Sequence, residues 1–260
     1  MLALLEPAGN RLAEFLWGGA ELGGRPRLIA HRGAWDADGI TENTMPAFER
    51  AAALGCEGIE FDVRLTADEV PVILHDPDLR RVAGARARIE DLTYFEARRI
   101  FPQLASFSRV ITAWGGRLHL MIELKSHRRL ARMVRIVQQH LGCLEPKRDY
   151  HLLILEPAQL EAIPARLWPA VVAVGTAGMA SRSRLARRAG LAGIAGPLWF
   201  CSQNLIDAHR RSGQWVGTGF VTHRGVCHRE LRRGAEFVFT NVPGQILEGQ
   251  TLGKLQCGHC

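Results

Sequence analysis

Short apolar runs alternate with segments of helical periodicity along almost the whole of this 260-residue chain. The strand-like runs are the eight segments Leu28–His31, Ile59–Val63, Leu118–Leu124, His151–Leu155, Ala170–Gly175, Gly193–Leu198, Trp215–Phe220 and Phe237–Asn241. Helical periodicity recurs in most of the gaps, over Met45–Leu54, His127–Leu141, Ala158–Arg166, Arg182–Ala189, Gln203–Arg211 and His228–Arg233. The alternation predicts an α/β fold, a (β/α)8 TIM barrel. A doubly wound open sheet is the alternative, although no G-x-G-x-x-G motif follows the first strand.

A ninth apolar run, Val70–Leu74, interrupts this alternation. Only Thr66-Ala67-Asp68-Glu69 separates it from the second strand, and parallel neighbours need a crossover of roughly a dozen residues or more. The two runs are therefore predicted to form a β-hairpin that extends the barrel after its second strand. Counted outward from the turn, Asp62 lies roughly opposite His75, so the hairpin brings a histidine to the mouth of the barrel.

The interval Pro77–Gly116 is the longest without a clear barrel strand, and it predicts a short insertion before the strand at Leu118–Leu124. Its basic part, Arg80–Arg88, is predicted to be a loop, and Leu92–Ile100 is predicted to be a helix. Insertions at this face of a barrel commonly shape the substrate pocket.

Three regions are expected along the chain. Residues 1–25 form an N-terminal arm that closes one end of the barrel, with an amphipathic helix over roughly residues 9–17; contact with a membrane surface is the alternative for this helix. Residues 26–247 form the TIM-barrel domain, and residues 248–260 form a C-terminal tail. The terminal Cys257-Gly-His-Cys260 lacks a second CxxC motif and is interpreted as part of a disordered tail rather than a redox or metal site.

The charge and the cysteines limit the class of partner and the compartment. A net charge of +7 favours anionic ligands, but no Lys/Arg run with interleaved aromatic residues indicates nucleic-acid binding. The chain has no stretch of about 18 consecutive apolar residues, so no transmembrane span is predicted. The N-terminus lacks the basic region of a secretory signal. The six cysteines are therefore interpreted as reduced thiols of a cytoplasmic protein. Contact with a membrane surface stays open, and so does the oligomeric state.

Ionisable residues gather at the predicted carboxyl ends of the strands, where TIM barrels build their active sites. They are His31, Arg32, Glu60, Asp62, Glu123 and Lys125, with His75 added from the hairpin. Glu60 and Asp62 are two residues apart, so both point to the same face of their strand. With Glu123 they form an all-oxygen set that suits Mg²⁺ or Ca²⁺ better than zinc. The alternatives are a solvent-facing stripe for Glu60 and Asp62, and a simple ion pair for Glu123 and Lys125.

Several motifs in the same region resemble a known family. They are His31-Arg32-Gly33, Glu42-Asn43-Thr44, Ala47-Phe48, Gly55, Ile59-Glu60-Phe61-Asp62-Val63, Thr66-x-Asp68, Pro71-Val72, His75-Asp76 and Ile122-Glu123-Leu124-Lys125. In order and spacing they are similar to the glycerophosphodiester phosphodiesterase family over about a hundred residues. The resemblance implies a TIM barrel and a metal-dependent enzyme that cleaves glycerophosphodiesters, such as glycerophosphocholine, to glycerol 3-phosphate and an alcohol.

The resemblance also implies roles for individual residues. Glu60, Asp62 and Glu123 would be the metal ligands, and Arg32 and Lys125 would hold the phosphate. His31 and His75 would form the acid/base pair, in which analogy favours His75 as the acid. The nucleophile is either water or a neighbouring substrate hydroxyl that yields a cyclic phosphate.

The charges of these residues make those roles physically consistent. Three carboxylates around a divalent cation leave a net charge near −1, which repels a phosphodiester anion. Arg32 and Lys125 offset this repulsion, and a guanidinium can hold two phosphate oxygens at once. Glu42 has either a supporting role beside the site or only a favourable interaction with the N-terminus of the helix that follows. Asn43 is expected to cap that helix.

The second half of the chain departs from the family pattern. Leu155-Glu156-Pro157 replaces Ser-Phe, Gly219-Phe220-Val221-Thr222 replaces Trp-Thr-Val-Asn, and Thr240-Asn241 replaces Thr-Asp. We therefore predict a metal-dependent phosphodiester hydrolase acting on small glycerophosphodiesters by His/His catalysis, and leave the released alcohol open. One alternative is a lysophospholipid or other lipid phosphodiesterase acting at a membrane surface. The other is a non-catalytic barrel that binds a phosphorylated metabolite.

Overall fold

The computed structural model describes residues 27–125, 128–176 and 178–247. Eight parallel strands follow one another around a barrel, and β1 pairs with both β2 and β9, which closes it. The strands are β1 (Leu28–His31), β2 (Gly58–Leu65), β4 (His119–Leu124), β5 (Tyr150–Ile154), β6 (Val171–Val174), β7 (Gly193–Pro197), β8 (Trp215–Gly219) and β9 (Phe237–Thr240). The closure confirms the predicted (β/α)8 TIM barrel and excludes the open sheet.

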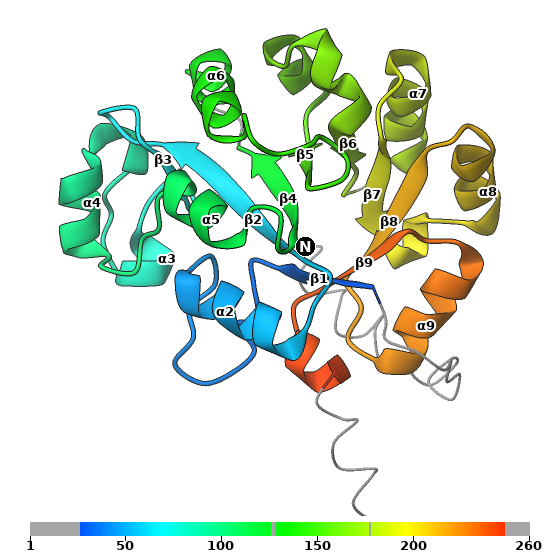
Figure 1. The fold of residues 1–260 in the computed structure, drawn as a ribbon, viewed down its shortest axis with the longest axis horizontal. Coiled ribbons are helices and arrows are strands. Elements are labelled where there is room, and N and C mark those ends of the chain that lie inside the picture. The colour runs from blue at the N-terminus through cyan, green and yellow to red at the C-terminus, as the bar shows by residue number, and fades with distance from the viewer. Residues whose placement is uncertain (1–26, 126–127, 177, 248–260) are drawn as a thin grey trace, which may run out of the picture.

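Helices cover the outside of the barrel (Figure 1). The α-helices are α2 (Met45–Leu54), α3 (Arg80–Ala83), α4 (Tyr94–Ile100), α5 (Phe107–Trp114), α6 (Leu130–His140), α7 (Met179–Ala189), α8 (Gln203–Arg211) and α9 (Arg224–Arg233). The boundaries of α2 and α8 are those that the sequence predicts. Gly55 ends α2 in the left-handed conformation, with φ of 69°, which glycine adopts without a steric penalty.

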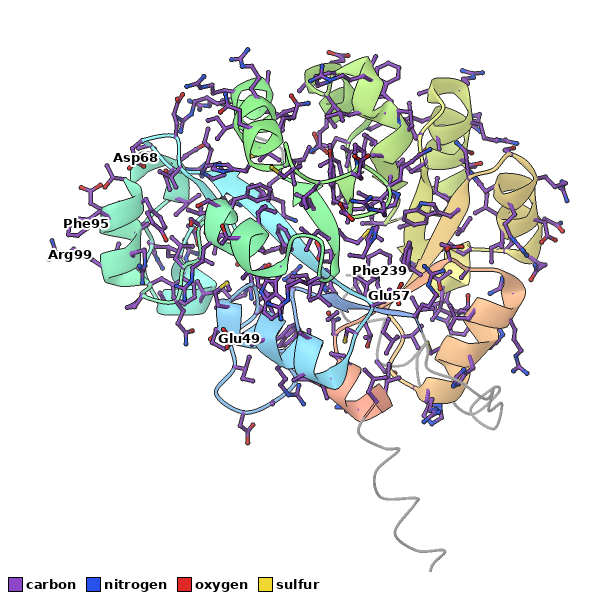
Figure 2. The ribbon with its side chains drawn as sticks, viewed as in Figure 1. Glu49, Glu57, Asp68, Phe95, Arg99 and Phe239 are labelled. Carbon is purple, nitrogen blue, oxygen red and sulfur yellow. The ribbon has the colours of Figure 1, made fainter. Side chains whose placement is uncertain are left out.

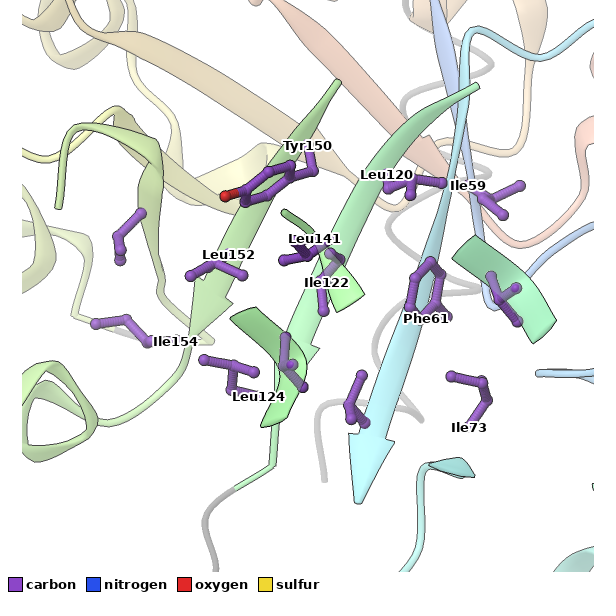
Figure 3. Close-up of a cluster of buried hydrophobic side chains, with 14 of the residues drawn as sticks. Ile59, Phe61, Ile73, Leu120, Ile122, Leu124, Leu141, Tyr150, Leu152 and Ile154 are labelled. Atoms are coloured by element: carbon purple, nitrogen blue, oxygen red, sulfur yellow. The ribbon is translucent and has the colours of Figure 1, made fainter. Parts of the chain in front are cut away.

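The alternation of side chains along β2 directs its carboxylates into the barrel. Ile59, Phe61 and Val63 are fully buried in the hydrophobic layer between the strands and the helices. Figure 3 shows Ile59 and Phe61 on one side of β2, in the cluster that also contains residues of β4 and β5. Glu60 and Asp62 occupy the intervening positions, so they point into the barrel.

A layer of apolar side chains fills the interior of the barrel directly below the ionisable residues. Ile29, Met121 and Leu153 are buried together, two residues ahead of His31, Glu123 and Leu155 on their strands. Because side chains two residues apart share a face, this layer lies directly beneath the ionisable groups. It keeps water away from the inner side of those groups, which strengthens the electrostatic interactions between them.

The predicted hairpin is present, but its register differs by one residue from the prediction. The strand β3 (Pro71–Ile73) runs antiparallel to β2, with Val63 opposite Ile73. The backbone N–H of Leu74 donates to the carbonyl of Asp62 at 2.9 Å, so Leu74, rather than His75, lies opposite Asp62. His75 follows the end of β3, and its side chain reaches the barrel mouth from the turn after the strand.

The insertion between β3 and β4 contains more helix than the sequence predicts. The segment expected to be a basic loop begins with α3, and its end at Arg88 forms an isolated antiparallel bridge with Asp78. A 3-10 turn, η1 (Ile89–Asp91), precedes α4. The helix predicted over Leu92–Ile100 therefore begins at Tyr94, two residues later than expected. A capping box between Thr93 and Glu96 fixes that start.

One predicted helix is wrong. The segment predicted as Ala158–Arg166 consists of two 3-10 helices, η2 (Pro157–Ala162) and η3 (Ala165–Ala170). Pro164 separates them, and a proline in an α-helix removes one hydrogen bond and clashes with the preceding turn. The connection after β7 likewise opens with a 3-10 turn, η4 (Leu198–Phe200), before α8.

Figure 2 shows Phe95 and Arg99 of α4 pointing away from the barrel. Phe95 is 72% exposed, the largest exposed fraction among the large apolar side chains described. In the described part of the chain no helix combines the length and hydrophobicity needed to span a membrane. The predicted arm (residues 1–25) and tail (residues 248–260), with its Cys257 and Cys260, lie outside the described residues.

Candidate active site

A pocket of about 420 Å³ opens at the carboxyl ends of the barrel strands. One side of it is formed by ionisable residues and Trp35, which belong to β1, β2 and β4 and to the segments after β1, β3 and β4. These are His31, Arg32, Trp35, Glu42, Glu60, His75, Glu123 and Lys125. Asp62 is fully buried and lies behind this wall, where it contacts Lys125. The structure thus brings every site residue that the sequence predicts to one end of the barrel.

Three buried carboxylates form a candidate metal centre. One oxygen from each of Glu60, Asp62 and Glu123 lies within 4.8 Å of the others. Oε1 of Glu60 is buried without a hydrogen-bond partner among the described residues, although such an atom is costly to leave unpaired. Three carboxylates with a free oxygen fit a hard divalent cation such as Mg²⁺ or Ca²⁺.

Burial and mutual repulsion control the protonation of these carboxyl groups. Burial, followed by the charges of Asp62 and Glu123, raises the pKa of Glu60 well above its ordinary value. Burial and Asp62 also raise the pKa of Glu123. Burial opposes ionisation of Asp62 as well, but Lys125 and Arg32 outweigh it and lower the pKa of Asp62. Protons therefore compete with a bound cation more strongly at Glu60 and Glu123 than at Asp62.

The ammonium group of Lys125 lies between two of the carboxylates. Its Nζ is 2.7 Å from Oδ1 of Asp62 and forms a second ion pair with Oε1 of Glu123. Although burial favours the neutral amine, these two charges raise the pKa of Lys125. In this arrangement Lys125 neutralises part of the acidic cluster at the edge of the pocket.

Arg32 adopts a backbone conformation that is unusual for a residue other than glycine. Its φ is 60°, and such strain is concentrated at functional sites. The turn is held because the backbone N–H of Arg32 donates to Oε2 of Glu60 at 3.1 Å, while its carbonyl accepts from the N–H of Asn43. The guanidinium is thereby directed to Oε1 of Glu42 at 2.9 Å and Oδ2 of Asp62 at 3.5 Å.

His31 is held in one tautomer. Its Nδ1–H donates to Oδ1 of Asn241 at 2.6 Å, which leaves the lone pair on Nε2, 3.6 Å from Oε2 of Glu60. Burial, and next the charge of Arg32, lower the pKa of His31 to about 4. The imidazole is therefore neutral at pH 7 and able to accept a proton. The ring of Phe220 lies against it, with the centroids 4.4 Å apart.

His75 faces the same pocket from the hairpin side. Its Nδ1 is 2.7 Å from Oδ1 of Asp76, whose carboxylate accepts the hydrogen bond, so Nε2 is the nitrogen available for proton exchange. Burial lowers the pKa of His75, and Lys125 and Arg32 act in the same direction. Asp76 in turn accepts a hydrogen bond from Nε of Arg81 at 2.6 Å.

Four residues of this network are absent from the predicted site: Asn43, Asp76, Arg81 and Asn241. Asn43 does not cap α2 as expected, because the N-cap is Thr44; instead Nδ2 of Asn43 donates to Oδ2 of Asp62 at 2.7 Å. Asp76 was recognisable from its position beside His75. Asn241 was recognisable only as a departure from the family's Thr-Asp motif, and nothing in the sequence connected it with His31. Arg81 lies in the predicted basic loop, and its partners Glu42 and Asp76 could not be identified from the sequence.

The other side of the pocket is mostly apolar. It is formed by residues at the ends of β5 to β9 and the loops after them: Leu153, Leu155, Val174, Gly175, Thr176, Ala195, Gly196, Pro197, Gly219, Phe220, Phe239 and Asn241. Among these, Thr176 and Asn241 alone have polar side chains, and Asn241 is bound to His31. The departures from the family pattern at Leu155 and Phe220 lie on this side.

The fold and the site define an α/β barrel with a carboxylate-rich candidate metal centre at its mouth. Residues 31–141 match the model of the Glycerophosphoryl diester phosphodiesterase family. The chain is 41% identical over 73 residues to a glycerophosphodiester phosphodiesterase of Caldanaerobacter subterraneus subsp. tengcongensis, covering 28% of this chain and 29% of that protein. It is 38% identical over 78 residues to human glycerophosphodiester phosphodiesterase 1, covering 30% and 23%. The chain thus aligns with less than a third of the length of these curated relatives.

Solved structures extend the similarity of fold to most of the chain. A glycerophosphodiester phosphodiesterase from Thermotoga maritima superposes with a TM-score of 0.70 at 19% identity, covering 90% of this chain and all of that one. An Oleispira antarctica phosphodiesterase, determined with its product sn-glycerol-3-phosphate, has a TM-score of 0.68 at 21% identity over 92% of this chain and 99% of that one. The comparisons confirm the relationship to the glycerophosphodiester phosphodiesterase family that the motifs indicate.

Proposed function

We propose that the protein is a metal-dependent phosphodiesterase that hydrolyses glycerophosphodiesters to glycerol 3-phosphate and an alcohol. The observation that carries the proposal is the cluster of Glu60, Asp62 and Glu123, whose oxygens lie within 4.8 Å of one another, beside two histidines in one pocket. The relatives named above, all called phosphodiesterases, support the same reaction. We assign Mg²⁺ or Ca²⁺ to the centre because all three ligands are oxygens.

The residues around the centre suit the proposed reaction. A divalent cation held by Glu60, Asp62 and Glu123 would polarise a phosphoryl oxygen as a Lewis acid. Arg32 binds the phosphodiester with its guanidinium, which is already fixed by Glu42, and Lys125 adds a second positive charge. These two cations offset the repulsion between an acidic centre and an anionic substrate.

Proton transfer is assigned to the two histidines. Neutral His31 accepts a proton at Nε2 from the attacking water or substrate hydroxyl, because Asn241 keeps its Nδ1 protonated. The protonated form of His75 carries a hydrogen on both ring nitrogens and donates the one on Nε2 to the departing alkoxide, while Asp76 keeps the one on Nδ1. The phosphodiester anion opposes the effect of Arg32 and Lys125 on the pKa of His75, since a nearby negative charge favours the protonated ring.

The proposal extends to the parts of the chain that surround the site. Residues 26–247 are assigned to the catalytic barrel, and the protein is assigned to the cytoplasm. The last assignment is consistent with the free thiols of the four described cysteines, Cys56, Cys143, Cys201 and Cys227.

The test is turnover by the purified protein. With Mg²⁺ or Ca²⁺ present, glycerophosphocholine or another glycerophosphodiester is expected to release glycerol 3-phosphate, measured by a coupled dehydrogenase assay. EDTA is expected to abolish the signal, and excess divalent metal to restore it. A protein that binds glycerol 3-phosphate but hydrolyses no member of a diester panel would instead be a non-catalytic binding barrel.

The apolar side of the pocket favours a second candidate, a lipid phosphodiesterase. Leu155, Val174 and Phe220 offer an alkyl or acyl chain a surface that a choline headgroup does not need. Trp199 and Phe200, each 45% exposed, follow two and three residues after the pocket residue Pro197. Such a substrate would be met at a membrane surface.

This candidate predicts a change in preference when the apolar wall is made polar. Leu155→Ser is expected to lower kcat/KM for lysophosphatidylcholine by roughly tenfold or more, the usual cost of losing apolar contact in a specificity pocket, and to leave kcat/KM for glycerophosphocholine nearly unchanged. Leu144→Ser is the matched control, because Leu144 is also half-buried but lies outside the pocket. Equal losses on both substrates would argue against an apolar substituent.

A further inference from the structure

Arg81, on the short helix α3 of the insertion, bridges two acidic residues of the site. Its Nη2 lies 2.8 Å from Oε1 of Glu42, and its Nε lies 2.6 Å from Oδ2 of Asp76. Glu42 and Asp76 belong to separate segments of the chain, one before α2 and the other after β3. One guanidinium therefore connects the loop that follows β1 with the turn that follows the hairpin.

Each acidic partner contacts a residue of the proposed reaction. Oε1 of Glu42 accepts a second hydrogen bond from Nη1 of Arg32 at 2.9 Å, so two guanidinium groups share that one oxygen. Oδ1 of Asp76 accepts from Nδ1 of His75 at 2.7 Å. A continuous chain of charged hydrogen bonds thus runs from Arg32 through Glu42, Arg81 and Asp76 to His75.

The exposure of this chain indicates that its role is orientation more than stability. The side chain of Arg81 is 45% exposed and that of Asp76 25% exposed, and ion pairs with such access to water contribute little to folding. The side chain of Glu42, in contrast, is only 8% exposed. The helix that carries Arg81 is itself anchored by Leu79, which is fully buried and accepts a backbone hydrogen bond from Ala83.

We propose that Arg81 is a positioning residue that orients the phosphate-binding Arg32 through Glu42 and the proton-donating His75 through Asp76. The proposal rests on the proposed function. Through Glu42, Arg81 limits the rotation of the Arg32 guanidinium. Through Asp76, Arg81 keeps Nδ1 of His75 protonated and Nε2 directed to the pocket. In other functional histidines, too, a carboxylate that accepts a hydrogen bond from one ring nitrogen orients the other. The insertion thereby tunes binding and proton donation together.

Two substrates with different leaving groups distinguish the two branches of this network, the one to His75 and the one to Arg32. Loss of the His75 branch weakens proton donation, which an alkoxide leaving group needs and a p-nitrophenolate does not. Loss of the Arg32 branch weakens phosphate binding for either leaving group. Arg81→Met is therefore expected to lower kcat on glycerophosphocholine roughly 10–100-fold, the range for residues that orient functional groups. On glycerol 3-(p-nitrophenyl phosphate) kcat is expected to stay within about threefold, while KM rises for both esters.

Two further variants test each branch separately, and the neighbouring residue Arg80 supplies the control. Asp76→Asn is expected to reproduce the kcat effect alone, and Glu42→Gln the KM effect alone. Arg80→Met is the matched control, because Arg80 is the preceding residue of α3 and its side chain, 60% exposed, pairs with Asp78 outside the network. Equal losses on both esters at unchanged KM, or the same effects from Arg80→Met, would overturn the proposal.

A readout independent of turnover separates this proposal from the proposed function. ¹⁵N NMR of the histidine side chains is expected to show Nδ1-protonated His75 in the wild type and a mixture of tautomers in Arg81→Met, with an unchanged melting temperature. Calorimetry is expected to show weaker binding of glycerol 3-phosphate to the variant. If the wild type hydrolyses no diester, the proposed function fails. If His75 is unchanged in the variant, the role of Arg81 fails.

Discussion

Replacing Glu60 by glutamine is expected to lower phosphodiester turnover by about 10³-fold, because a bound metal contributes several kcal/mol of transition-state stabilisation. Glu60 is nearly fully buried, and its Oε1 has no hydrogen-bond partner among the described residues, so this oxygen is available to a cation. The amide is isosteric but cannot balance the charge of the metal. Metal affinity, measured by calorimetry with Ca²⁺ or Mg²⁺, is expected to fall together with turnover.

The matched control is Glu57→Gln, since Glu57 lies just before the other end of β2 and pairs with Arg27 at the surface. This variant is expected to keep wild-type metal affinity. In the wild type, affinity for the metal is expected to rise with pH, because burial raises the pKa values of Glu60 and Glu123 and their ionised forms bind the cation. Affinity that is independent of both Glu60 and pH would place the metal elsewhere.

The second large effect is expected from His31→Ala, which should reduce kcat about 10²–10⁴-fold, the usual contribution of a general acid or base. His31 is neutral at pH 7 because burial, assisted by Arg32, lowers its pKa to about 4. Binding of glycerol 3-phosphate is expected to change little, because Arg32 and Lys125 remain in place. The measurement is steady-state kinetics on glycerophosphocholine, with product affinity determined separately.

Asn241→Ala tests how His31 is held. Without the acceptor Oδ1 of Asn241, 2.6 Å from Nδ1 of His31, the ring can adopt the other tautomer, which has no lone pair on Nε2. A loss of roughly tenfold is expected, smaller than that of His31→Ala because part of the population keeps the productive tautomer. Full activity in both variants would remove His31 from the reaction.

The acidic cluster of the site was predictable because it follows from the periodicity of side chains along the strands. Glu60 and Asp62 alternate with Ile59, Phe61 and Val63, so burial of the apolar residues against the helices directs both carboxylates inward. Parallel strands then place the end of β4 beside β2, with Glu123 directly opposite Asp62. Neither step needs more than local sequence and the barrel topology.

Other features were beyond such reasoning. The hairpin register was off by one residue, because the turn conformation decides it and several turns fit Thr66–Glu69. Pro164 divides the predicted helix at Ala158–Arg166 into η2 and η3. Arg81 lies in a segment interpreted as a basic loop, and only the structure shows its contacts with Glu42 and Asp76.

By itself, therefore, the sequence determined the barrel, the acidic cluster and the presence of two histidines, because each follows from short-range periodicity or from motifs within the match over residues 31–141. Only the tertiary structure decided how those groups are held. Asn241 meets His31 across 210 residues, and Arg81 meets Glu42 across 39. Such contacts depend on barrel closure and loop conformation, so no local pattern encodes them.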